Sequence, residues 1–332
     1  DNNRVRNLQS TGTPVGENLE TVSMEELYDT VYPIKKPLVE DLIYNGVYLF
    51  VGAPKVGKSF LMAEIGFCVS AGIDLWGHKT NQGTVLYLAL EDDYARLQQR
   101  LSRMFGIDVA EHFYFATRSK NLNEGLEEQL KEFLVAHADT RLVIIDTLQK
   151  IKEISGDKFS YANDYDIITK LKHFADEHNI CILVVHHTRK MDSSDAFEMI
   201  SGTNGLLGAA DGAFIMQKEK RTDLKATVDI TGRDQQDQKL YLKFEPELCL
   251  WKFEKAETEL WKEPEDKVLS AVNTYLMASE LMDKIQEINL VPNQLTRQLN
   301  IKAGRLYEDY GIRYDNKRCH DGRIITLEYE KE

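Results

Sequence analysis

The sequence predicts an α/β fold in which a mostly parallel sheet is covered by helices on both faces. Four apolar runs indicate buried strands, at residues 47–51, 85–90, 141–145 and 180–186. Segments with apolar residues at helical spacing lie between these runs, and strands that alternate with helices form parallel sheets. Four shorter alternating segments between residues 213 and 253 predict an extension of the sheet that is at least partly antiparallel.

The composition is that of an ordinary globular protein. The 332 residues are 42% hydrophobic and 29% charged. At roughly 100 to 200 residues per domain, this length predicts one large domain and a small additional module. No apolar run approaches the roughly 18 residues of a membrane helix, and the polar first residues lack the apolar core of a signal peptide. We therefore expect a cytoplasmic location.

Cysteine spacing and net charge exclude some classes of function. Cys68, Cys181, Cys249 and Cys319 form no Cys-x-x-Cys pair, which argues against a zinc site and a disulfide framework and indicates packing residues. The net charge of -13 is unfavourable for nonspecific binding of nucleic acid, because Lys and Arg must neutralise the phosphates. Any contact with DNA therefore has to be local.

A glycine-rich segment directly follows the first predicted strand. Residues 52–59 match the P-loop pattern G-x-x-x-x-G-K-[ST], and a helix is predicted from Ser59 to Ala71. In such a loop the backbone N–H groups surround an anion, Lys58 reaches the β- and γ-phosphates, and Ser59 gives its hydroxyl to magnesium. The alternative is a chance glycine-rich turn, which the flanking strand and helix disfavour. The expected ATP contacts are Gly52, Ala53, Pro54, Lys55, Val56, Gly57, Lys58, Ser59 and Phe60.

A second ligand for Mg²⁺ is expected at the end of a neighbouring strand. Asp146 follows four apolar residues at the carboxyl end of its strand, where ligands bind in open α/β sheets. A strand-end aspartate can also cap the next turn. Beside a P-loop we favour the metal role.

The acid that activates water has to come from another strand, because Thr147 follows Asp146. Glu91 ends the run 85–90 and is the candidate to polarise the attacking water. The alternative is that the acids at this point cap the next helix, a role that suits Asp92 or Asp93.

Two histidines, His186 and His187, end the fourth strand. We predict that His187 senses the γ-phosphate and passes its presence or loss to the following loop. A purely structural role is the alternative for a histidine in this position.

Together these residues resemble the RecA-fold hexameric helicases, namely the RepA-like and DnaB-like families. The resemblance spans residues 44–253 and is closest to the RepA-like ATPases of mobile elements in Gram-positive bacteria. It implies a RecA-like core, ATP hydrolysis with Mg²⁺, a homohexamer and movement on single-stranded DNA. By position, Lys58 and Ser59 match the Walker A pair, Asp146 matches Walker B, Glu91 matches the catalytic glutamate, and His187 matches the γ-phosphate sensor.

The resemblance also implies a residue that acts on a neighbouring subunit. Residues 231–234 align with the turn that carries a lysine and an arginine finger in DnaB-type rings. Arg233 fits the finger, which stabilises transition-state charge in trans. Thr231 stands where the lysine is expected, and without the family Arg233 would be a solvated surface residue.

In such folds the loops after Asp146 and after His187 face the central channel of the ring. Cations of the kind that track single-stranded DNA lie in both loops. Ordinary surface charge is the alternative, because acidic residues are mixed in. These cations are Lys150, Lys152, Lys158, Arg189 and Lys190. A further stripe, Arg96, Arg100 and Arg103, is expected to be solvated or to lie between subunits.

A winged helix-turn-helix is predicted at the carboxyl end of the chain. Helices are expected at 266–277, 294–299 and 301–310, and a hairpin at 312–329 with Asp321 and Gly322 as its turn. A local excess of Lys and Arg is what binding of duplex DNA needs, and protein docking is an equally open alternative. The candidate phosphate contacts are Arg305, Arg313, Lys317, Arg318 and Arg323.

The expected organisation is a flexible arm at 1–24, a RecA-like ATPase domain at 25–260 and a winged helix at 265–332. The expected function is an ATP-hydrolysing DNA motor of the replicative-helicase type. Two alternatives stay open: an ATP-gated initiator, loader or regulator that does not unwind DNA, and a recombination mediator that forms filaments.

Overall fold

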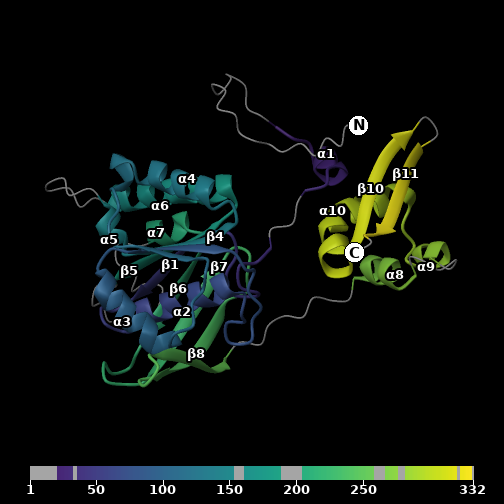
Figure 1. The fold of residues 1–332 in the computed structure, drawn as a ribbon. Helices are drawn as coiled ribbons and strands as arrows, with labels where there is room; N and C mark the ends of the chain where they lie inside the picture. Colours follow the sequence, from purple (N-terminus) through teal and green to yellow (C-terminus); the bar gives the residue numbers. More distant parts are fainter. Residues whose placement is uncertain are drawn as a thin grey trace. The chain divides into compact units, whose positions relative to one another are not determined.

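The computed structural model describes residues 21–32, 36–152, 161–187, 204–257, 266–275, 281–319 and 322–330. The chain divides into two compact units, which are shown in Figure 1. The larger unit is Lys35–Trp261, and the smaller one joins Asp1–Ile34 to Lys262–Glu332. The expected arm at 1–24 falls mostly on residues 1–20, which lie outside the described residues.

Within the described residues, the larger unit is built on a nine-stranded sheet of the order β3-β2-β4-β5-β1-β6-β7-β8-β9. The six strands from β3 to β6 pair in parallel, and the pairs from β6 to β9 are antiparallel. The predicted mixed sheet is therefore confirmed. The strands are β1 Gly46–Gly52, β2 Thr84–Ala89, β3 Phe113–Ala116, β4 Thr140–Asp146, β5 Cys181–His187, β6 Gly212–Gln217, β7 Lys225–Gly232, β8 Gln238–Glu245 and β9 Leu250–Ala256.

Helices cover both faces of this sheet (Figure 1). Successive residues of β1 enter two different cores: Tyr48 and Phe50 pack with α2 on one face, and Val47 and Leu49 face the other core. Burial on both faces explains why the central strands are continuous apolar runs rather than alternating ones. The helices of this unit are α2 Lys58–Ala71, α3 Tyr94–Phe105, α4 Leu126–Ala136, α5 Leu148–Ile151, α6 Tyr161–His178 and α7 Asn204–Ala209, with a 3₁₀ turn at Leu122–Glu124.

The smaller unit contains a group of helices and a two-stranded antiparallel hairpin. Its carboxyl-terminal helix α10 is continuous, so the expectation of two helices at 294–299 and 301–310 is wrong. The hairpin is confirmed, but Gly322 already pairs with Cys319, so Gly322 is a strand residue and Asp321 lies outside the described residues. The elements are α1 Met24–Asp29, α8 Lys267–Tyr275, α9 Leu281–Glu287, α10 Pro292–Tyr310, β10 Ile312–Cys319 and β11 Gly322–Tyr329.

Helix α1 belongs to the smaller unit, although residues from 25 onward were expected in the ATPase domain. Ser23 caps α1 by accepting a hydrogen bond from the Glu26 N–H. The Asn300 side chain on α10 donates to the Tyr28 carbonyl over 3.0 Å, and Arg297 lies 3.6 Å from the Asp29 carboxylate. These contacts tie α1 to α10. None of the helices in the described segments has both the length and the apolar character that crossing a bilayer requires.

Candidate nucleotide site

Four parallel strands bring the predicted site residues to one edge of the sheet. Gly52 at the end of β1 pairs with His187 at the end of β5, and Asp146 at the end of β4 pairs with Ala89 at the end of β2. Glu91 follows β2 by two residues. Because parallel strands all end at the same edge, groups that are far apart in sequence meet there.

The P-loop lies between β1 and α2, and its two glycines are required sterically. A Cβ atom on Gly52 would lie 2.6 Å from the Met216 carbonyl oxygen on β6. Gly57 has a φ of 108°, and a Cβ atom there would lie 2.8 Å from the Trp251 ring on β9. The loop pattern therefore reflects the packing of the two neighbouring elements as well as the space that an anion needs.

Lys58 is nearly buried inside the loop. Its Nζ donates to the carbonyl oxygens of Gly52 at 2.7 Å and Ala53 at 2.9 Å, and lies 3.1 Å from His187 Nδ1. Burial lowers the pKa of Lys58 to about 8, and the nearby Asp146 and Glu91 carboxylates act in the opposite direction. At neutral pH the group remains largely an ammonium, as a contact to phosphate requires.

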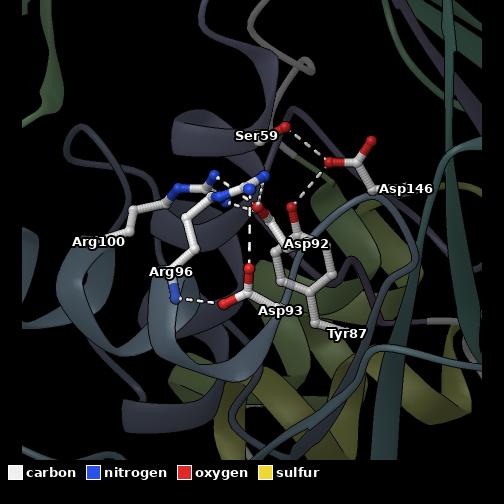
Figure 2. Close-up of polar contacts among 7 residues, drawn as sticks. All are labelled: Ser59, Tyr87, Asp92, Asp93, Arg96, Arg100 and Asp146. Atoms are coloured by element: carbon white, nitrogen blue, oxygen red, sulfur yellow. Dashed lines mark hydrogen bonds and ion pairs between the residues drawn. The ribbon is translucent and has the colours of Figure 1, made fainter.

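Ser59 and Asp146, the two predicted magnesium ligands, touch each other. The Ser59 hydroxyl donates to Asp146 Oδ2 over 2.7 Å, and the Tyr87 hydroxyl donates to the same oxygen over 2.9 Å (Figure 2). Burial raises the pKa of Asp146, whereas the hydrogen bonds from Ser59 and Tyr87 act to lower it. A hydroxyl beside a carboxylate is the kind of oxygen donor set that suits Mg²⁺.

Glu91 is exposed and lies beside the cluster of Lys58, Ser59 and Asp146. The Thr147 hydroxyl donates to Glu91 Oε1 over 3.4 Å. The Glu91 carboxylate also acts electrostatically on Lys58 and His187, raising the pKa of both groups. Glu91 therefore lies on the side of the sheet edge where the other candidate residues meet.

The two acids that follow Glu91, Asp92 and Asp93, are bound by residues of α3 (Figure 2). Asp93 caps α3 by accepting from the Arg96 N–H over 2.8 Å, which confirms the capping alternative for this residue. Asp92 forms an ion pair of 2.7 Å with Arg100, which lies 5.4 Å from the centre of the Phe60 ring.

In the arginine stripe on α3, Arg96 and Arg103 are exposed, as expected, and the expectation of a solvated or intersubunit residue does not hold for Arg100. The Arg100 side chain is only 16% exposed. Arg103 donates to the carbonyl oxygens of Pro246 and Glu247 in the turn before β9.

Arg233 lies near the amino-terminal ends of the parallel strands, away from the ends that carry the P-loop. It follows β7, whose last residue Gly232 pairs with Gly212 at the start of β6. The seven residues of β1 separate these amino-terminal ends from the P-loop by roughly 20 Å. The Arg233 side chain is 59% exposed, lies 3.9 Å from the buried Asp211 carboxylate and donates to the Gly208 carbonyl. Arg233 therefore cannot reach the P-loop of its own chain.

Only part of the expected DNA-channel set lies in the described residues. Lys150 is exposed on α5, but Lys152 is 9% exposed, so the expectation of a solvent-facing cation does not hold for Lys152. Lys158, Arg189 and Lys190 lie outside the described residues.

Sequence reasoning missed a buried network behind the P-loop. Trp251 Nε1 donates to the Gly57 carbonyl over 3.2 Å, and the Trp251 N–H donates to the Glu64 carboxylate on α2 over 2.9 Å. Trp76 Nε1 donates to the Trp251 carbonyl over 2.9 Å. Burial raises the pKa of Glu64 to about 7. No motif carries a signal for these contacts, because they join residues nearly two hundred positions apart.

The sequence can be placed in a family once this geometry is known. The AAA_25 family model, described as an AAA domain, matches residues 14–193, which is more than half of the chain. The chain belongs to this family.

The chain is also similar to bacterial DNA repair proteins. It is 26% identical over 180 residues to the DNA repair protein RadA of Streptococcus pneumoniae, a match that covers 54% of the chain and 37% of RadA. RadA of Streptococcus pyogenes serotype M6 is 23% identical over 176 residues, covering 52% and 35%. The chain thus spans about a third of the length of these relatives.

Solved structures show which fold this AAA-family chain has. A solved ATPase domain matches with a TM-score of 0.53 and 14% identity, over 64% of this chain and 85% of that one. A DnaB-like replicative helicase matches with a TM-score of 0.52 and 14% identity, over 62% and 58%. The predicted RecA-like P-loop core is confirmed. The chain therefore has the RecA-like fold of these two solved structures, with a P-loop after its first strand.

Proposed function

We propose that this ATPase is a DNA motor of the replicative-helicase type, encoded by a mobile element, that moves along single-stranded DNA. The observation that carries the proposal is the meeting of Lys58, Asp146 and His187 at one sheet edge, with Glu91 at its mouth. A P-loop lysine, a metal-binding acid and a separate water-polarising acid are the parts that phosphoryl transfer to water needs.

Each residue has a distinct part in hydrolysis. Lys58 binds the terminal phosphates, and Ser59 and Asp146 hold Mg²⁺, which neutralises charge on the phosphate oxygens when bound. Glu91 orients the attacking water and accepts its proton. His187 senses the γ-phosphate through Lys58, with which it is in contact.

Assembly and DNA binding complete the proposal. Arg233 lies on the edge away from its own P-loop, so a homohexameric ring would deliver it to the phosphates of the next subunit. Lys150, together with Arg189 and Lys190, would contact single-stranded DNA in the channel. The segment 265–332 would act as a winged helix that binds duplex DNA or a replication protein, since its helices precede an antiparallel hairpin.

The decisive experiment measures ATPase activity with and without single-stranded DNA, beside strand displacement on a forked duplex. We expect stimulation by DNA and unwinding that requires ATP. Lys58→Ala should abolish hydrolysis, and Glu91→Gln should bind ATP but hydrolyse it at least about a hundredfold more slowly. The exposed Lys131→Ala on α4 is the matched control and should behave like wild type. Normal hydrolysis by Lys58→Ala would refute the site.

A second candidate is an ATP-gated initiator, loader or regulator that binds DNA without unwinding it. The net charge of -13 and the presence of Thr231 where a second trans-acting cation is expected favour this candidate. ATP-dependent binding of DNA without strand displacement would select it. A filament in negative-stain images, in place of a ring, would instead select a recombination mediator.

A further inference from the structure

Tyr87 places a hydroxyl group inside an apolar core. The residue lies on β2 with none of its surface exposed, and its ring packs 5.9 Å from the centre of the Phe115 ring. Burying a hydroxyl is unfavourable unless it forms a hydrogen bond, and a phenylalanine would fill almost the same volume. In the described part of the chain the hydroxyl has one partner, Asp146 Oδ2, at 2.9 Å.

The sheet register explains how Tyr87 reaches this carboxylate. Tyr87 pairs with Ile144, and Ala89 pairs with Asp146. Residues two apart on a strand point to the same face, so Tyr87 and Asp146 both face the α2 side of the sheet.

The two donors to Asp146 differ in what they are expected to do. Ser59 and Tyr87 both donate to Oδ2 of Asp146 (Figure 2). Ser59 is itself a proposed metal ligand, so its oxygen serves the metal as well as Asp146. Tyr87 is enclosed in the core and can only hold the carboxylate.

We propose that Tyr87 is a positioning residue of the magnesium site, which orients the Asp146 carboxylate through the hydrogen bond from its hydroxyl to Oδ2. The proposal rests on the metal role given above to Ser59 and Asp146. Groups that orient metal-binding carboxylates and histidines commonly change metal affinity by a factor of about 10 to 100 when they are lost.

The test is Tyr87→Phe in the full chain, with binding of Mn²⁺ to the protein–ADP complex measured by electron paramagnetic resonance. We expect Mn²⁺ affinity to fall about tenfold or more, and metal-free ADP affinity to stay the same. The matched control is Tyr48→Phe on β1. Tyr48 is equally buried, but its hydroxyl donates to Gln235 over 3.0 Å, so this variant should keep wild-type Mn²⁺ affinity. Unchanged Mn²⁺ affinity in Tyr87→Phe would overturn the proposal.

Two further measurements separate the possible failures. If Ser59→Ala and Asp146→Asn lose Mn²⁺ binding while Tyr87→Phe keeps it, only the role of Tyr87 is wrong; if all three keep it, the metal site itself is wrong. A magnesium titration of ATPase activity excludes general damage to the fold. Recovery of Tyr87→Phe activity at high Mg²⁺ supports the proposal, and activity that no Mg²⁺ concentration restores contradicts it.

Discussion

The Lys58 ammonium at the start of α2 and Nδ1 of His187 at the end of β5 lie 3.1 Å apart. An ammonium can only donate, so this ring nitrogen accepts the hydrogen bond and carries no proton. The pKa of His187 is lowered, first by burial and then by the Lys58 charge, which agrees with a neutral ring. A bound phosphate would compete with His187 for the N–H groups of Lys58.

That competition predicts a specific defect in His187→Ala. The variant should bind nucleotide, because Lys58 keeps its two carbonyl partners, but should lose the stimulation of ATPase activity by single-stranded DNA. ATPase assays with and without an oligonucleotide check this. His186→Ala is the neighbouring control, because alternate residues of a strand face opposite sides of the sheet. Wild-type stimulation in His187→Ala would exclude the sensor role.

Gly57→Ala should disable the loop through two separate effects. The φ of 108° disfavours alanine, and the added Cβ atom would meet the Trp251 ring at 2.8 Å. We expect a loss of about 2 to 4 kcal/mol of stability together with loss of nucleotide binding. Gly77→Ala is the matched control, since Gly77 has a φ of 89° with open space around its Cβ position. Denaturant titration of Gly77→Ala should show a loss of stability of about 1 to 2 kcal/mol from the backbone effect alone. Equal losses in the two variants would mean that the Trp251 contact is unimportant.

The buried Glu64 carboxyl should make the free energy of unfolding depend on pH. Burial raises its pKa from 4.5 to about 7 in the folded protein, so the folded state binds the proton more tightly than the unfolded state. The contribution of Glu64 to the free energy of unfolding is therefore complete below about pH 4.5. It falls by about 3 kcal/mol as the pH rises to about 7. Glu64→Gln should remove this decline and be more stable than wild type at pH 8.

Urea unfolding between pH 5 and pH 8 measures the effect. Glu128→Gln, an exposed substitution on α4, controls for the change in net charge. A slope in Glu64→Gln equal to that of wild type would assign the pH dependence to other groups.

Arg233 should act on another subunit. Both Arg233→Ala and Lys58→Ala are expected to be inactive alone. When the two are mixed, a shared interface can combine Lys58 of one chain with Arg233 of the next, and roughly a quarter of interfaces in an equal mixture are complete. ATPase activity should therefore return on mixing. If it does not return although mass measurement shows mixed assemblies, the trans role is wrong.

The strands and the site residues at their ends could be predicted because each depends on local sequence. An apolar run followed by glycines fixes the position of Gly52 and Lys58, and parallel topology then brings Asp146 and His187 to the same edge. Strand β3 was not predicted, because its four residues form too short an apolar run to identify a strand. The roles proposed for Glu91 and Arg233 remain predictions.

Other features depend on contacts that a local pattern does not contain. Asn300 was expected to separate two helices, but in α10 its side chain accepts from the Tyr314 hydroxyl and donates to the Tyr28 carbonyl. These bonds satisfy an otherwise unfavourable residue within a helix. Trp251 and Glu64 were missed for the same reason, since their hydrogen bond joins β9 to α2.

The order of strands in the sheet has a consequence for synthesis on the ribosome. Strand β1 carries the P-loop and emerges first, but its neighbours in the sheet are β5 and β6. Strand β2 emerges next and is separated from β1 by β4 and β5. A nascent chain that stops before Cys181 therefore leaves both edges of the P-loop strand without a partner, so the nucleotide site cannot be completed until β5 and β6 have been synthesised.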